Sequence, residues 1–161
     1  MKNIKKGIGY IILLAPVIFT CHFLEESPGF VSWFNMHVSR GITSSLFWNV
    51  NISALAITLF IVLFEFFEPS FLSALLTIFW FSFLMLANAV FHVTGSLVDQ
   101  AYMPGLITAI ILYFPYYFWI ISRIVKARRI KIGWVIALSC LGSLPMLIHG
   151  YMILFLDSRL F

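Results

Sequence analysis

Residues 50–67, VNISALAITLFIVLFEFF, decide the fold, because these 18 positions hold a single charged residue, Glu65. An apolar stretch of about 17–25 residues is long enough to cross a bilayer as a helix. The chain has 161 residues, of which 62% are hydrophobic and 10% charged. Only helices and closed barrels satisfy the backbone in lipid. We therefore predict one all-α, polytopic transmembrane domain, residues 1–161, with about five spans: 7–24, 50–67, 73–95, 103–122 and 132–156.

The basic residues predict the orientation. Three lysines precede the first span and five basic residues separate the fourth span from the fifth, whereas only Arg40 and Arg159 lie elsewhere. With five spans the two basic segments share one face, which the positive-inside rule places in the cytoplasm. We predict a multi-pass protein of the cell membrane with its N-terminus inside, and no nucleic-acid partner. The eight residues are Lys2, Lys5, Lys6, Arg123, Lys126, Arg128, Arg129 and Lys131.

Two further segments are predicted from this topology. Residues 27–49 form the longest connection, face outward and are rich in Phe and Trp, which suit the membrane interface. This interfacial aromatic loop would hold a short surface helix or a lid over the bundle. Glu65 and Glu68 lie at the cytoplasmic end of the second span, where we expect solvated charges at a helix end.

The outer end of the first span carries three ionisable side chains in five residues, in the sequence His22-Phe-Leu-Glu25-Glu26. Ionisable groups in an apolar span are costly and commonly mark a functional site. Residues separated by three and four positions share a helix face. We therefore expect His22, Glu25 and Glu26 to point the same way, as metal ligands or proton carriers would.

Two more histidines are predicted at a similar depth. With a rise of about 1.5 Å per residue, His22, His92 and His149 lie roughly 10, 12 and 8 Å outward of the centres of three different spans. Asn88 precedes His92 by one helical turn and Thr108 also falls in the outer half. Intramembrane ionisable residues usually face the bundle interior and pair with one another. The sequence predicts one polar site in the outer half.

This five-residue motif and two later sequence motifs resemble those of a known family. His22-Phe-Leu-Glu25-Glu26 is similar to the motif that names the HXXEE family of small multi-pass membrane proteins. Asn88-x-x-x-His92 and Pro104-Gly105-x-x-Thr108 resemble later motif blocks of that family, and the resemblance extends to about residue 122. It implies a membrane fold and a shared polar site; the family carries no established activity.

The site residues suit metal chemistry. Read backwards, the motif resembles the zinc-binding pattern His-Glu-x-x-His with one histidine replaced. His22, Glu26 and His92 would bind a divalent metal (Zn, Fe or Mn), and Glu25 would activate water as the catalytic base. A lipid or lipid-linked substrate would reach such a site from the bilayer. Supporting polar contacts would come from Asn88, Tyr102, Thr108 and His149.

Two other functions fit the same residues. Carboxylates and histidines also form the ion sites and proton relays of a transporter or channel subunit, for which a homo-oligomer could supply the pathway. Alternatively, the cluster staples helices together in a non-catalytic structural or accessory protein, because interhelical polar contacts stabilise membrane bundles.

Overall fold

The protein is described by a computed structural model that covers residues 8–160, so the predicted basic residues Lys2, Lys5 and Lys6 lie outside the described residues. Within residues 8–160 all regular structure is helical, which confirms the predicted fold class. The elements are η1 (Tyr10–Leu14), α1 (Ala15–Glu26), α2 (Phe30–His37), α3 (Ser44–Phe67), α4 (Phe71–Phe81), η2 (Ser82–Ala87), α5 (Asn88–Asp99), α6 (Leu106–Thr108), η3 (Ala109–Tyr113), α7 (Phe114–Lys126) and α8 (Ile132–Leu156).

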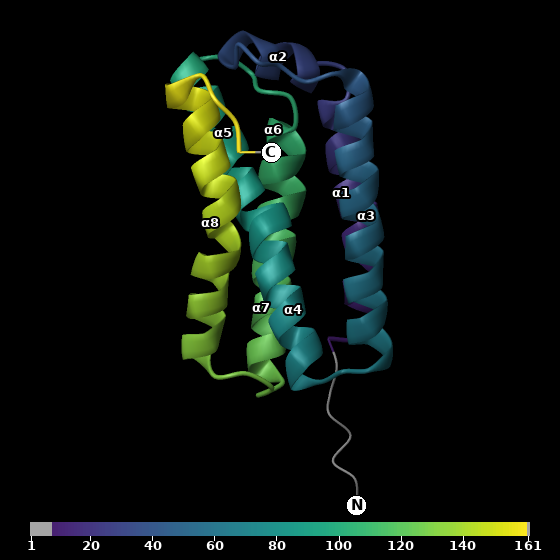
Figure 1. The fold of residues 1–161 in the computed structure, drawn as a ribbon. Coiled ribbons are helices and arrows are strands. Elements are labelled where there is room, and N and C mark those ends of the chain that lie inside the picture. Colours follow the sequence, from purple (N-terminus) through teal and green to yellow (C-terminus); the bar gives the residue numbers. More distant parts are fainter. Residues whose placement is uncertain (1–7, 161) are drawn as a thin grey trace, which may run out of the picture.

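Several of these elements join into rods long enough to cross a membrane. Among residues 8–160, four continuous apolar helices are long enough to cross a membrane: 44–67, 71–99, 106–126 and 132–156. The helical segment 10–26 and α2 are bent by 65° relative to each other, and together they would count as a fifth span. The rods run side by side along the bundle (Figure 1). α3 packs on α1 and α4, whereas α8 packs on α4, η2 and α5. Four to five apolar helices fit a membrane protein, as predicted.

Many large apolar side chains face outward along these rods. Phe60 and Phe67 of α3 are 67% and 70% exposed, and Ile111 and Trp119 of the η3–α7 rod are 60% and 51% exposed. A soluble monomer rarely leaves such a continuous apolar surface in contact with water. The surrounding hydrocarbon of a bilayer therefore explains the low polarity of the helix exteriors.

The predicted aromatic loop folds as a short helix across one end of the bundle. α2 lies over the ends of the long rods in Figure 1, and α3 begins at Ser44, earlier than the predicted start at residue 50. Trp33 and Phe34 of α2 are buried against the bundle. Trp33 donates a hydrogen bond to Asp99 at the end of α5 (2.6 Å), and His37 also contacts that carboxylate (2.9 Å). Asp99 therefore anchors α2 as a cap.

At the other end of the bundle, the prediction for Glu65 was wrong. Glu68 is exposed as expected, but Glu65 is buried and forms an ion pair with Arg129 of the α7–α8 loop. Ser73 in the first turn of α4 donates a hydrogen bond to the same carboxylate (2.6 Å). The basic residue that compensates Glu65 is 64 positions away, so the sequence pattern near α3 gave no sign of it.

The Asp99 anchor predicts that the attachment of α2 depends on pH. Burial lowers the pKa of His37, but hydrogen bonds to the Trp33 carbonyl and to Asp99 raise it and prevail, so the pKa lies above the ordinary value for histidine. A raised pKa stabilises the fold below the ordinary value, and this contribution is lost as the pH rises through the raised value.

We expect an NMR titration to give His37 a higher pKa in the wild-type protein than in Asp99→Asn. In the variant, the extra thermal stability of the wild type at acid pH should disappear. An unchanged His37 titration in Asp99→Asn would contradict the anchoring role of this carboxylate.

Candidate metal centre

The end of α1 and the middle of α5 bring three predicted ligands together. His22 and Glu26 lie one turn apart on α1, and His92 of α5 faces them; all three are buried. Glu26 Oε1 lies 3.0 Å from His92 Nε2 and 3.5 Å from His22 Nε2. The two imidazole rings meet edge to face, with centroids 4.8 Å apart. The structure therefore places a carboxylate oxygen between two imidazoles inside the bundle.

Thr108 orients His22. Its hydroxyl lies 2.8 Å from His22 Nδ1 and also donates to the Gly105 carbonyl at 3.3 Å. With the hydroxyl proton donated to that carbonyl, the Thr108 oxygen is placed to accept the proton of Nδ1, which would leave the Nε2 lone pair for a metal. Metal-binding histidines are commonly fixed in this way through the nitrogen that does not bind.

The buried nitrogens of the cluster lack hydrogen-bond partners. Within the part of the chain that the structure describes, His22 Nε2 and both ring nitrogens of His92 form no hydrogen bond of acceptable angle, although the two Nε2 atoms lie 3.5 and 3.0 Å from Glu26 Oε1. An unsatisfied buried polar atom carries a desolvation cost of about 1–3 kcal/mol. A cation bound by Glu26 and the two Nε2 atoms would satisfy two of these three nitrogens at once.

The spacing fits a small metal ion. Each of the three residues offers one ligand atom, and these atoms all lie within 4.8 Å of one another. Around a tetrahedral zinc with bonds of about 2.0–2.1 Å, neighbouring ligand atoms are about 3.3 Å apart. The two contacts to Glu26 have this spacing, and a small inward shift of the imidazoles would complete the geometry. The cluster could thus hold a metal ion.

Gly105 lets the backbone approach all three ligands. It lies in the turn before α6 with φ +95°, a conformation that favours glycine. A Cβ at this position would lie 2.6 Å from His92, 2.9 Å from Glu26 and 3.0 Å from His22. The predicted Pro104-Gly105-x-x-Thr108 block therefore forms one wall of the cluster.

Glu25, the predicted catalytic base, binds the start of the long helix 106–126 and is not part of the three-residue cluster. Its carboxylate accepts hydrogen bonds from the backbone amides of Ile107 (3.0 Å) and Thr108 (2.8 Å), and from the Tyr102 hydroxyl (2.5 Å). Glu25 thus caps the start of the fourth rod and does not join the three ligands. Burial, and to a lesser extent the hydrogen bond to Glu25, raises the pKa of Tyr102 to about 12. Tyr102 thus contacts Glu25, and the Thr108 hydroxyl contacts His22.

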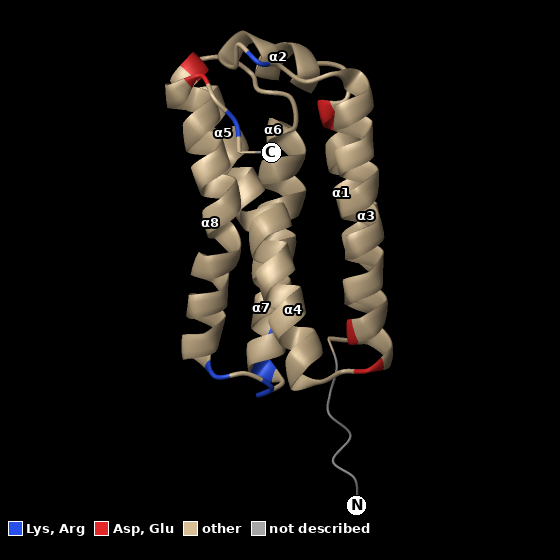
Figure 2. Ribbon diagram, in the orientation of Figure 1, with Lys and Arg blue, Asp and Glu red and all other residues tan. Residues whose placement is uncertain are grey.

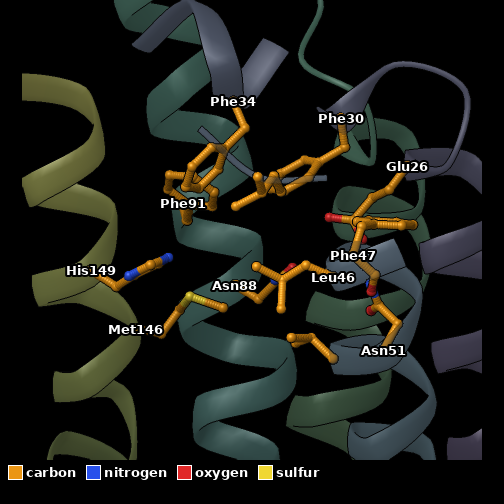
Figure 3. A pocket seen from close by; sticks show the side chains of 12 residues that line it. Glu26, Phe30, Phe34, Leu46, Phe47, Asn51, Asn88, Phe91, Met146 and His149 are labelled. Atoms are coloured by element: carbon orange, nitrogen blue, oxygen red, sulfur yellow. The ribbon is translucent and has the colours of Figure 1, made fainter. Parts of the chain in front are cut away.

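A mostly apolar pocket of about 340 Å³ adjoins the cluster at Glu26. Figure 3 shows phenylalanines of α2 over it, α3 and α8 on two sides, and Asn88 with Phe91 of α5 between them. Asn88 Oδ1 is buried and has no hydrogen-bond partner among the described residues. His149 lines the pocket from α8 and accepts a hydrogen bond from the Leu160 amide (3.0 Å). The pocket thus joins the supporting residues Asn88 and His149 to Glu26.

The sequence also matches a known protein family. The sequence model of a family described as a protein of unknown function with HXXEE motif matches residues 13–120. The chain belongs to the HXXEE family. Searches of curated proteins and of solved structures gave no match. The HXXEE match includes the three ligands, Gly105 and Thr108, whereas α8 with His149 lies beyond it.

Tyr113 is a site residue that the sequence reasoning missed. Its ring lies against His22, with centroids 4.1 Å apart, and its hydroxyl is buried without a hydrogen-bond partner in residues 8–160. It ends η3, one of two π-helical segments; the other, η2, directly precedes Asn88. Such segments are frequent at functional sites. A polar side chain in an apolar span was the available signal for Tyr113.

We expect Gly105→Ala to disrupt the centre. The added methyl group meets all three ligand side chains and also strains a backbone with positive φ, at a cost of roughly 1–3 kcal/mol. Gly9→Ala is the matched control, because Gly9 has φ +84° and a Cβ there would meet no atom within 4 Å. Thermal unfolding in detergent should show a larger loss for Gly105→Ala. Equal losses would indicate that backbone strain alone matters.

Proposed function

We propose that the protein is a membrane-embedded, metal-dependent enzyme with a hydrolase-like site for a lipid or lipid-linked substrate. The observation that carries the proposal is the buried cluster of His22, Glu26 and His92, whose unpartnered nitrogens adjoin an apolar pocket through Glu26. Three protein ligands with a fourth open position are typical of catalytic zinc sites. Iron or manganese would also accept this ligand set.

The roles of the residues follow from their contacts. The two imidazoles and Glu26 would hold the ion, and a metal lowers the pKa of bound water to about 7. A bound metal would thus supply activated water near neutral pH, and Glu25 would not be needed as the base. Glu25 instead positions the site, since it binds the Thr108 amide (2.8 Å) while the Thr108 hydroxyl holds His22.

The pocket supports a substrate with a hydrocarbon chain. Its volume of about 340 Å³ lies at the lower end of the range for ligand sites, roughly 300–1,000 Å³. Aromatic rings of Phe30, Phe34, Phe47 and Phe91 line it. The unpartnered oxygen of Asn88 would accept a hydrogen bond from a hydroxyl or amide group near the reacting bond. A chain in contact with the rings would place that polar group beside Glu26.

We also propose that the protein resides in the cell membrane with its N-terminus inside, so that the metal centre lies in the outer half. The α7–α8 loop carries basic residues at the end opposite α2 (Figure 2). Reporter fusions after residue 129 and within residues 38–43 should then report cytoplasm and exterior, respectively. The reverse result would place the centre in the inner half.

We expect protein purified in detergent to retain a stoichiometric transition metal, measured by elemental analysis. His22→Ala, His92→Ala and Glu26→Gln should each lose it, because two ligands rarely hold zinc. His37→Gln is the control, since this histidine contacts Asp99 rather than the cluster. Metal content that is absent in the wild type, or equal in all variants, would exclude the proposal.

A structural role is the second candidate, and one observation favours it. Glu26 of α1 contacts His92 of α5 at 3.0 Å, which joins two helices without any metal. In this case His92→Gln and Glu26→Gln should lower the melting temperature by several degrees in protein treated with chelator as much as in untreated protein. A metal-dependent difference in stability between wild type and variants would favour the enzyme instead.

A further inference from the structure

A second pocket, of about 440 Å³, lies at the end of the bundle opposite the metal centre. Its lining residues come from the start of α4, the end of α7, the α7–α8 loop and the start of α8. These segments lie at the same end of the bundle in Figure 1. Its lining combines aromatic and aliphatic groups with three basic side chains. The lining residues are Phe71, Val125, Arg128, Arg129, Ile130, Lys131 and Trp134.

Arg129 forms the fixed inner wall of this pocket. Its side chain is only 4% exposed and is held by Glu65, by Ser73 Oγ at 3.0 Å and by the Ser70 carbonyl. These contacts use its two terminal nitrogens, whereas the buried Nε has no partner among residues 8–160. Because Glu65 neutralises Arg129, this residue adds no net charge to the pocket. It contributes a fixed wall and one free hydrogen-bond donor, the Nε–H group.

Arg128 and Lys131 supply the net positive charge. Both are exposed, and in the described part of the chain neither side chain forms a hydrogen bond or an ion pair. The remaining acidic group at this end, Glu68, follows α3 and does not line the pocket. Two uncompensated cations beside a fixed guanidinium attract an anion, and arginine matches phosphate geometry particularly well.

The start of α8 adds backbone donors to the same place. Lys131 is the N-cap of α8 and provides no side-chain cap for the first amides. The positive end of a 25-residue helix dipole favours anions. The pocket thus combines side-chain charge with the N-terminus of a long helix.

The depth of the pocket indicates a lipid. Trp134 lines the pocket and is 54% exposed, and tryptophan is enriched at the headgroup level of a bilayer. Basic pockets between membrane helices on the cytoplasmic side bind anionic headgroups. We propose that this pocket binds the phosphate of an anionic phospholipid, with Arg128 and Lys131 as its ligands and Arg129 as the fixed wall.

The experiment measures binding of phosphatidylglycerol and of phosphatidylcholine to the full-length protein in detergent, through the change in melting temperature. Phosphatidylglycerol should stabilise the wild type more. The double variant Arg128→Gln/Lys131→Gln should weaken its binding by on the order of tenfold or more, since each basic residue contributes about 1 kcal/mol to anionic lipid binding.

The matched control is Arg123→Gln/Lys126→Gln, which removes the same charge from the exposed end of α7 outside the pocket. It should retain most of the preference for phosphatidylglycerol. Equal losses in both double variants would overturn the pocket in favour of general surface attraction. Equal stabilisation by inorganic phosphate would overturn the lipid assignment, because a soluble anion would then suffice.

Discussion

The arrangement of the end of the bundle beneath α2 depends on one constraint, the burial of the Glu26 carboxylate. A charged group in an apolar interior is stable only with partners of suitable charge or hydrogen-bonding capacity. Two imidazoles, from α1 and α5, lie 3.5 and 3.0 Å from the same oxygen. The approach of the Glu26 carboxylate to His92 therefore joins α1 to α5 inside the bundle.

The turn before α6 packs directly against the cluster of His22, Glu26 and His92. Gly105 allows the backbone to lie against the ligands, and Thr108 fixes His22 through its hydroxyl. Glu25 secures this turn through two backbone amides. The two adjacent glutamates of the motif thus have different tasks: one contributes to the cluster and the other holds the chain segment that closes it.

The two ends of the bundle use buried charge differently. At the end of the bundle opposite α2, the carboxylate of Glu65 is engaged by Arg129 and Ser73, so it stabilises the packing of the α7–α8 loop on α3 and α4. At the α2 end, the two Nε2 atoms beside Glu26 form no hydrogen bond of acceptable angle within residues 8–160, and a pocket reaches Glu26. A satisfied ion pair favours a structural role, whereas unpartnered ligands beside a pocket favour binding and chemistry.

The sequence alone predicted the apolar helices and the grouping of His22, Glu26 and His92. Long apolar stretches leave helices as the only stable form in lipid, and spacing on a helix places His22 beside Glu26. Equal depth then brought His92 to the same level. Depth does not fix the direction of a side chain around its helix, so the sequence could not place Glu25 on the α6 backbone or His149 across the pocket.

Only the tertiary structure decided which polar groups meet. It paired Glu65 with Arg129, which is 64 residues away, and set Tyr113 against His22. It also folded the aromatic loop into α2, a cap over the pocket. The physical reason is that the rotation and packing of each helix depend on contacts with all its neighbours, and a single sequence does not contain the list of those contacts.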